Sequence, residues 1–186
     1  MASEPIRHLF TTAEYHSMAE AGVLEPEGRF ELIEGEIYQM PPIGSRHAGC
    51  VNWLTRTFVR RLDERAVLGP QNPVVLSDIS EPQPDIVLLR PRADDYRESH
   101  PGTEDVLLIV EVADSTLPFD RRKKVPLYAR CGVPEVWVAN LVDGELEVYR
   151  DPSPQGFRSV QRLGREDRIA PLAFPDVELA VGKVLG

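Results

Sequence analysis

The chain has 186 residues, of which 42% are hydrophobic and 27% charged, and this composition fits one globular domain with a substantial core. Its formal net charge of -9 opposes non-specific binding to nucleic acid, which Lys and Arg drive by neutralising phosphates. The charge does not exclude a metal-dependent enzyme, because a divalent cation bound by acidic side chains reverses the local electric field.

Other features narrow the class of protein further. No stretch approaches the roughly 20 consecutive apolar residues that cross a bilayer. The N-terminus, MASEPIRHLFTTAEY, lacks the apolar centre of a secretory signal. Cys50 and Cys131 are too few and too far apart for a disulfide framework or a zinc knuckle. We therefore expect a cytoplasmic protein that has no contact with membranes.

The beginning of the chain predicts a helix and a hairpin. Residues 12–21 follow a plausible N-cap at Thr11 or Thr12, and the predicted helix ends at Gly22. Residues 29–40 are typical of two short strands joined by a turn at Glu34-Gly35.

A longer helix and two strands are expected next. From Arg46 to about Arg65, apolar residues recur at three- and four-residue steps, which is typical of an amphipathic helix, here capped by Ser45. Residues 72–79 and 84–91 read as strands bounded by prolines, and a polar connection follows at 92–105.

The rest of the chain predicts more strands than helices. A helix is expected from about Asp120 to Arg130, with Gly132 as a suitable C-terminal residue. Asp143-Gly144 is a strong hairpin signal. The predicted strands are 106–113, 135–141, 145–150 and 157–163. Because strands arrive in runs, the pattern favours an α+β (mixed α/β) fold around one sheet.

Two carboxylates are expected at one edge of this sheet. Consecutive strands tend to pair, so the start of the first strand, at Asp85, would lie beside the end of the second, near Glu111. The alternation of a strand puts Leu107, Ile109 and Glu111 on one face. A buried, unpaired carboxylate costs several kcal/mol, so Glu111 needs a partner.

A lysine in the following helix is a candidate partner. Asp120, Lys124 and Tyr128 recur at four-residue steps and share one helix face. If that face meets the sheet edge, Lys124 points at Asp85 and Glu111. Two carboxylates and a lysine suit metal-dependent phosphodiester hydrolysis, whereas a structural salt bridge is the simpler interpretation of the same residues.

The other cations of the basic block are less informative. Arg121, Arg122 and Lys123 oppose the helix dipole at this end, and a solvated helix face explains them equally well. Pro126 is a difficulty for the predicted helix, because it lacks the N–H for one helical hydrogen bond and favours a kink or a delayed start.

Four segments together resemble a known family: FELIEGEIYQMPPIGSRHA, PQPDIVLL, LLIVEVADST and DRRKKVPLYARCGVPEVWVANL. Over roughly residues 10–150 the chain resembles the Uma-two family of restriction-endonuclease-like proteins, in the PD-(D/E)XK nuclease superfamily. The resemblance implies a single domain over residues 1–186. Its fold would be a mixed central sheet flanked by helices, with an added C-terminal hairpin.

The resemblance also implies roles for individual residues. Asp85 and Glu111 would bind Mg²⁺ or Mn²⁺ together with the backbone carbonyl of Val112. The lysine that the superfamily places two residues after the second acid is absent, because that position is Ala113. Lys124 fits the pattern of a lysine supplied by the next helix. The absence of a lysine at position 113 affects the expectation of catalytic activity but not that of the fold.

Further residues are candidates for supporting the metal without binding it: Glu31, His47, Asp114 and Asp120. Glu31 is as readily a polar strand residue, and His47 is more simply an exposed or capping side chain. Residues 114–116 would most often form a turn whose side chains satisfy the backbone, although their proximity to the site leaves a ligand role as the alternative.

Three functions remain open from the sequence. The first is a Mg²⁺-dependent nuclease that cleaves DNA, expected by analogy to be a homodimer. The second is a catalytically silent, dimeric binding or regulatory domain, favoured by Ala113 and the acidic charge. The third is metal-dependent hydrolysis of another substrate. The sequence defines neither a recognition site nor a preference for DNA over RNA, and His8, His16 and His100 show no partner in it.

Overall fold

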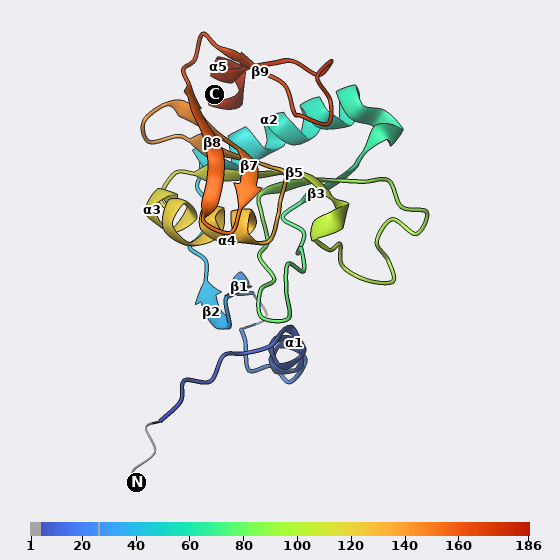
Figure 1. The fold of residues 1–186 in the computed structure, drawn as a ribbon, viewed down its shortest axis with the longest axis vertical. Helices are drawn as coiled ribbons and strands as arrows, with labels where there is room; N and C mark the ends of the chain where they lie inside the picture. Colours follow the sequence, from blue (N-terminus) through green and yellow to red (C-terminus); the bar gives the residue numbers. More distant parts are fainter. Residues whose placement is uncertain (1–4, 26) are drawn as a thin grey trace.

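A mixed six-stranded sheet forms the centre of the computed structural model, which describes residues 5–25 and 27–186 (Figure 1). Strands β5 and β6 pair in parallel, and the other neighbours in the sheet pair antiparallel. In spatial order the strands are β3 (Val67–Pro70), β4 (Ile86–Leu89), β5 (Val106–Ala113), β6 (Glu135–Asn140), β7 (Glu145–Ser153) and β8 (Gly156–Leu163). The predicted fold class, a mixed sheet flanked by helices, is confirmed.

Helices cover both faces of the sheet, which explains why the central strands read as continuous apolar runs. Helix α2 (Ser45–Leu62) packs on one face, where Leu54 and Phe58 are fully buried beside Trp137. The opposite face carries three successive helical segments, and Figure 1 shows them on the far side of β5 from α2. These segments are α3 (Leu117–Phe119), the π-helical turn η3 (Asp120–Lys124) and α4 (Val125–Arg130).

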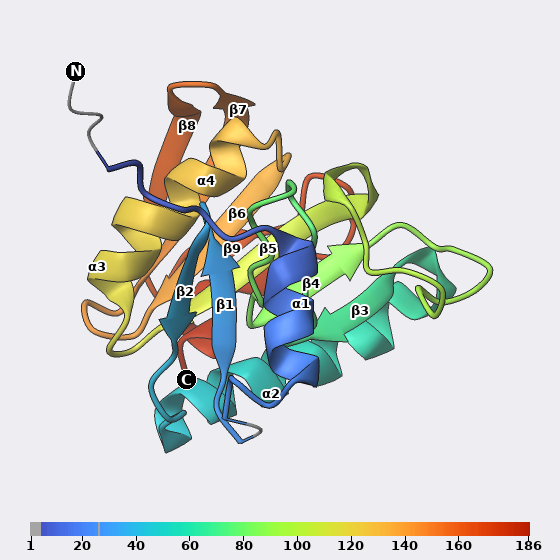
Figure 2. The same cartoon turned by 90° about the horizontal axis from the view of Figure 1, so that it is seen from below.

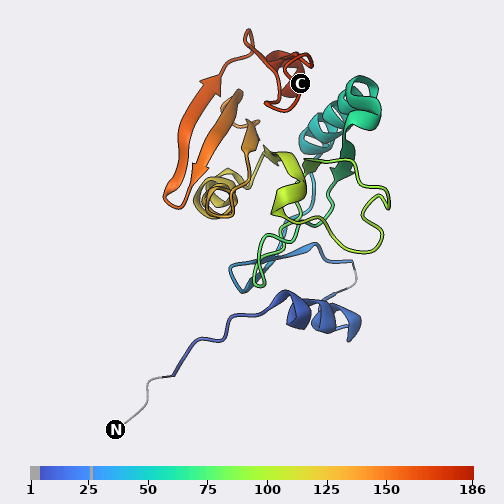
Figure 3. The ribbon, with the colours of Figure 1, turned by 45° about the vertical axis from the view of Figure 1, so that its right-hand side comes forward.

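The N-terminal part lies on the same side of the sheet as α4, as Figures 2 and 3 show. It consists of α1 (Thr12–Glu20) and the hairpin of β1 (Phe30–Ile33) and β2 (Glu36–Gln39). Thr11 caps α1 in a capping box with Glu14, as the sequence predicted for the first of its two candidate caps. The remaining elements are η1 (Asp63–Arg65), η2 (Thr103–Asp105), β9 (Arg168–Ile169), β10 (Leu179–Ala180) and α5 (Val181–Val184).

One strand prediction is wrong, and one strand of the sheet was not predicted. Residues 72–79 do not form a strand, because the segment folds back on itself: Val74 N donates to Pro82 O and Leu76 N donates to Ser80 O (both 3.0 Å). The strand that does pair with β4 is β3, and its short sequence, VLGP, gave no clear strand signal.

The alternation along β5 is also interrupted. A register shift between Leu88 and Leu89 leaves Leu107 outside the pairing, so Leu107 packs on the α2 side. Ile109 lies in the cluster on the opposite face. The bulge adds one residue to the period, which is why the expected common face for Leu107 and Ile109 is wrong.

Two helix boundaries differ from the prediction. The helical region after β5 begins at Leu117, ahead of the expected Asp120. Helix α2 has Gly44 as its N-cap, without a side-chain hydrogen bond, so Ser45 is the first helical residue and does not cap it.

The hairpin predicted at Asp143-Gly144 joins β6 and β7, and β7 continues into a hairpin with β8 that extends the sheet. This C-terminal extension was expected. Among the residues that the structure describes, no helix has both the length and the apolar character to cross a bilayer.

Candidate active site

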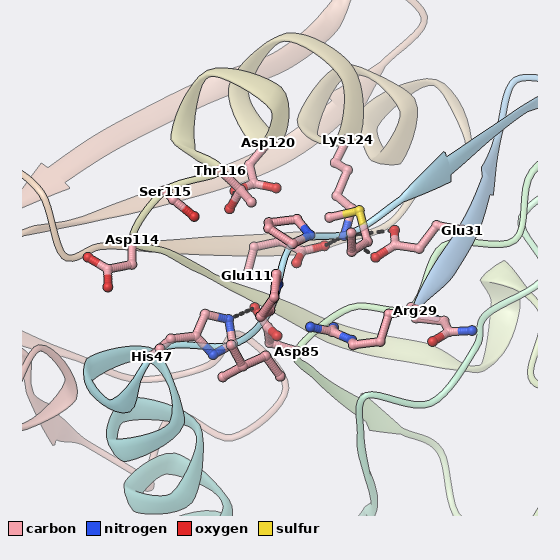
Figure 4. A pocket seen from close by; sticks show the side chains of 16 residues that line it. Arg29, Glu31, His47, Asp85, Glu111, Asp114, Ser115, Thr116, Asp120 and Lys124 are labelled. Carbon is pink, nitrogen blue, oxygen red and sulfur yellow. Dashed lines mark hydrogen bonds and ion pairs between the residues drawn. The ribbon is translucent and has the colours of Figure 1, made fainter. Parts of the chain in front are cut away.

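A pocket of about 190 Å³ opens where β4 begins and β5 ends, between the first turn of α2 and the helical segments α3 and η3 (Figure 4). The main chain brings Asp85 and Glu111 to this place because β4 and β5 are antiparallel neighbours, with Ile86 opposite Val110. Its lining includes Arg29, Glu31, His47, Gln83, Asp85, Glu111, Asp114, Ser115, Thr116, Asp120 and Lys124.

Asp85 is held from two directions. Its Oδ2 accepts a hydrogen bond from Val112 N (2.8 Å) and lies 3.0 Å from His47 Nε2. Burial raises the pKa of Asp85, but the His47 imidazole and the Val112 N–H outweigh burial and hold it below its usual value. Asp85 is therefore a carboxylate at neutral pH.

Of the two interpretations of His47, an exposed or capping side chain is wrong, whereas support of a metal site stays a prediction. Its side chain is 12% exposed and faces Asp85 across the pocket. Its Nδ1 is buried without a hydrogen-bond partner among the residues described. Figure 4 shows the ring on the α2 wall, directed at Asp85.

Glu111 and Lys124 form the buried centre of the site. Lys124 Nζ lies 3.1 Å from Glu111 Oε1 and 2.9 Å from Glu31 Oε2, so one ammonium group bridges two carboxylates. Tyr128 also donates its hydroxyl to Glu111 Oε1, at 2.5 Å. The sequence placed Lys124 against Glu111 correctly, but its second partner is Glu31, and no direct contact with Asp85 is seen within the described part of the chain.

Burial sets the ionisation of this centre. Burial is the largest cause that raises the pKa of Glu111 to about 8, while Lys124 opposes the rise. Burial likewise raises the pKa of Asp120 to about 6. Burial lowers the pKa of Lys124, but the Glu111 carboxylate and its neighbours outweigh burial and raise it above the ordinary lysine value. Lys124 is thus a permanent cation.

The helical face predicted for Lys124 exists despite the proline that follows it. Pro126 cannot donate a hydrogen bond to the carbonyl four residues earlier, and the preceding turn, η3, is π-helical. Asp120, Lys124 and Tyr128 are all buried on the side that meets the sheet. Ala113, at the position where the superfamily places its lysine, is fully buried in the apolar cluster that includes Val125 and Tyr128.

The carboxylates leave oxygens free for a cation. Both hydrogen bonds of Asp85 use Oδ2 and both of Glu111 use Oε1, so Asp85 Oδ1 and Glu111 Oε2 accept no hydrogen bond from the described residues. In a strand the N–H and C=O of one residue point to the same side, and Val112 N points to Asp85. The Val112 carbonyl therefore shares that edge. This donor set fits Mg²⁺, which binds one or two carboxylates and keeps several waters.

The remaining sequence candidates lie at the rim or serve structure. Asp114 lines the pocket and pairs with Arg46 (3.3 Å). Thr116 donates to Asp120 Oδ2 (2.7 Å), so this side chain bonds another side chain and not the backbone that the turn interpretation expected. Arg121 and Lys123 pair with acidic residues of β7 and β2 and lie outside the pocket.

A second, cation-lined pocket adjoins the first and was missed in the sequence. Its volume is about 490 Å³, Ser45 and Gly49 of α2 line it, and Trp53 supplies an aromatic face. No Asp or Glu is among its lining residues within the described chain. The cations are Arg46, Arg56, Arg165 and Lys183. Only the tertiary fold brings the last two to α2, so no local signal could have found them.

A family model with the description "Uma2: Putative restriction endonuclease" matches residues 12–182. The chain belongs to the Uma2 family. Among solved structures it is similar to "a putative nuclease belonging to DUF820 from Anabaena variabilis", with a TM-score of 0.72 and 16% identity over 95% of this chain and 97% of that one. At this identity the likeness establishes the fold alone. A search of curated proteins gave no significant match.

Proposed function

We propose that this Uma2-family chain is a Mg²⁺-dependent nuclease that hydrolyses DNA phosphodiester bonds. The observation that carries the proposal is the convergence of two free carboxylate oxygens, on Asp85 and Glu111, with the buried cation Lys124 in one pocket. Asp85 Oδ1, Glu111 Oε2 and the Val112 carbonyl would hold the ion. When bound, Mg²⁺ would lower the pKa of a coordinated water and offset charge on the phosphate.

The protein groups around these ligands have separable tasks. His47 and Val112 N fix Asp85 through Oδ2, which leaves the other oxygen directed to the pocket. Lys124 and Tyr128 fix Glu111 in the same way through Oε1. The Lys124 ammonium also supplies positive charge beside the attacking water and the transition-state phosphate.

The cation-lined pocket supports a nucleic-acid substrate. In a chain of net charge -9, four cations line a pocket whose described lining holds no Asp or Glu, and they form a local positive surface. Arg46 connects the two pockets, since it lines the second and pairs with Asp114 of the first. Phosphates entering the second pocket and a base stacked on Trp53 would place the next phosphate near Asp85.

A cleavage assay tests the proposal. The full chain is incubated with Mg²⁺ and single- or double-stranded DNA, alongside Asp85→Asn, Glu111→Gln and the exposed control Glu34→Gln. Product should form with the native chain and the control, require Mg²⁺, and disappear in the other two variants. Cleavage that survives Asp85→Asn and Glu111→Gln would place the activity elsewhere or in a contaminant.

The second function, a silent dimeric binding or regulatory domain, has two observations in its favour: Ala113 at the position of the superfamily's lysine and the net charge of -9. Mg²⁺-independent DNA binding without cleavage by the native chain would favour it. A homodimer remains part of both proposals, and sedimentation of the native chain tests it.

A further inference from the structure

Three side chains outside the candidate active site converge at a second place in the molecule. His16 comes from α1, Glu81 from the segment before β4, and His100 from the connection between β4 and β5. One possible ligand atom from each lies within 4.8 Å of the others. Glu81 is 3% exposed, whereas both histidines reach the surface.

The Glu81 carboxylate has little positive charge near it within this cluster. His16 Nε2 lies 2.9 Å and 2.8 Å from the two oxygens of Glu81, and no Lys or Arg side chain among the described residues reaches them. The ring of His100 lies edge-on to that of His16, with centroids 6.1 Å apart. A buried carboxylate whose only partner is a half-exposed imidazole is poorly compensated, and a cation at this point would complete it.

The backbone holds the three segments in place independently of these side chains. Thr12 N donates to Asp78 O (2.7 Å), which ties α1 to the segment that carries Glu81. Val75 N donates to Pro101 O (2.9 Å), which ties that segment to the connection that carries His100. Glu81 N donates to Leu32 O (2.7 Å) of β1. The cluster is therefore built on fixed main chain.

We propose that His16, Glu81 and His100 bind a transition-metal ion of the zinc class. Two imidazole nitrogens and one carboxylate suit Zn²⁺, which accepts three protein ligands and a water, whereas Mg²⁺ prefers an all-oxygen set. The ion neutralises Glu81 and joins α1 and the β4–β5 connection to the body of the protein. This site is separate in residues and in ligand chemistry from the pocket of Asp85 and Glu111.

The site would also steady the active-site pocket. Glu81 precedes Asp85 by one short Pro-Gln-Pro segment. It also pairs with Leu32, the neighbour of the Glu31 that contacts Lys124. An ion on Glu81 would therefore lie beside two segments that carry residues of the pocket, although the proposal does not depend on nuclease activity.

Metal titration of the full chain tests the site. The Glu111→Gln variant, freed of metal with a chelator, is titrated with Co²⁺ while visible absorption is followed, and Zn²⁺ affinity is measured by calorimetry. This background lacks the Glu111 carboxylate, one of the two proposed Mg²⁺ ligands of the other pocket. We expect binding of one ion, with intense visible bands that Zn²⁺ abolishes and excess Mg²⁺ does not.

Matched histidine variants identify the ligands. His100→Asn removes one ligand and leaves the bond between His16 and Glu81, so Zn²⁺ affinity should fall by more than the roughly 10- to 100-fold that losing an outer partner of a metal ligand costs. His8→Asn is the control, because His8 also pairs with a glutamate, Glu14 (3.1 Å), but is not part of the cluster. No Zn²⁺ binding in the background chain, or equal affinity in His100→Asn and His8→Asn with unchanged circular dichroism, would overturn the proposal.

Discussion

The molecule carries two clusters of ionisable groups that solve the same electrostatic problem differently. Around Glu111, burial is nearly complete and the protein supplies its own permanent cation, Lys124, which bridges two carboxylates. Around Glu81, burial is as deep, but its only partner in the described part of the chain is an imidazole, which carries charge conditionally. The first arrangement can persist without an added ion, whereas the second is completed by one.

The two clusters also differ in the ligands that they can bind. The Lys124 ammonium occupies one oxygen of Glu111 and leaves the other free, so a hard cation and a charged substrate can share the pocket with it. The His16–Glu81–His100 cluster presents nitrogen donors on the outer side of the protein and suits a structural ion. Chemistry is therefore expected at the lysine-containing cluster.

Lys124→Met should have the largest effect on DNA cleavage. The variant leaves Glu111 without a permanent cation, as Glu81 is in the second cluster. Loss of charge stabilisation at the transition state is expected to lower DNA cleavage by about 100-fold or more. Mg²⁺ affinity should change little, since the lysine contacts Glu111 Oε1 and not its free oxygen. Cleavage rate and calorimetric affinity are measured together.

The neighbouring Lys123→Met is the control for that variant, because Lys123 lies outside the pocket and pairs with Glu36 (3.6 Å). Native-like cleavage by Lys124→Met would show that the lysine serves structure alone. A melting curve tests whether Lys124→Met still folds. Loss of folding is a risk because the variant leaves two buried carboxylates without a cation.

His47→Asn should have a smaller effect, which falls on Mg²⁺ affinity. Loss of the imidazole removes a cause that lowers the Asp85 pKa and frees Oδ2 from one of its two contacts. Mg²⁺ affinity is expected to fall by about 10-fold or more, as for other residues that orient a metal ligand. His8→Asn serves again as the control, and equal Mg²⁺ affinity in both variants would remove His47 from the site.

The burial of Glu111 should make the stability of the folded protein depend on pH. In the folded, metal-free chain its pKa is raised from 4.5 to about 8, chiefly by burial. Glu111 therefore favours the folded state below its unfolded pKa of 4.5, and this contribution is lost as the pH rises through about 8. Denaturant unfolding of the native chain and Glu111→Gln, without metal, measures the difference.

The native chain should lose stability relative to Glu111→Gln between pH 5 and 8, by no more than about 1.4 kcal/mol per pH unit, the limit for one proton. Added Mg²⁺ should reverse the trend in the native chain only. A flat difference across this range would show that Lys124 keeps Glu111 ionised throughout.

Local sequence signals were sufficient for the centre of the site. Asp85 and Glu111 meet because consecutive apolar strands pair antiparallel, and Lys124 follows from its four-residue spacing to Tyr128. The helix that carries Lys124 was predicted about three residues short, since Pro126 obscured a π-helical turn that begins after Leu117–Phe119.

The contact partners of several side chains were not predicted, although Glu31 and His47 were named from the sequence as candidates for supporting the metal. His47 meets Asp85 only because α2 crosses the sheet at this edge, and no local pattern links residues 38 positions apart. Tertiary structure likewise sets the contact of Glu31 with Lys124 and that of His16 with Glu81. The bulge at Leu107 and the fold-back of residues 72–79 are likewise decided by pairing partners and not by local composition.

The most direct test of the account is whether Asp85 and Glu111 hold Mg²⁺. Thermal unfolding of the native chain, Glu111→Gln and the control Glu34→Gln is followed against Mg²⁺ concentration, with zinc-class ions removed beforehand. An ion that binds only the folded state stabilises it by about 2.7 kcal/mol at 100 times its dissociation constant. The midpoint should rise in the native chain and the control and stay constant in Glu111→Gln. An equal rise in all three proteins, or none in any at several millimolar Mg²⁺, would contradict the account.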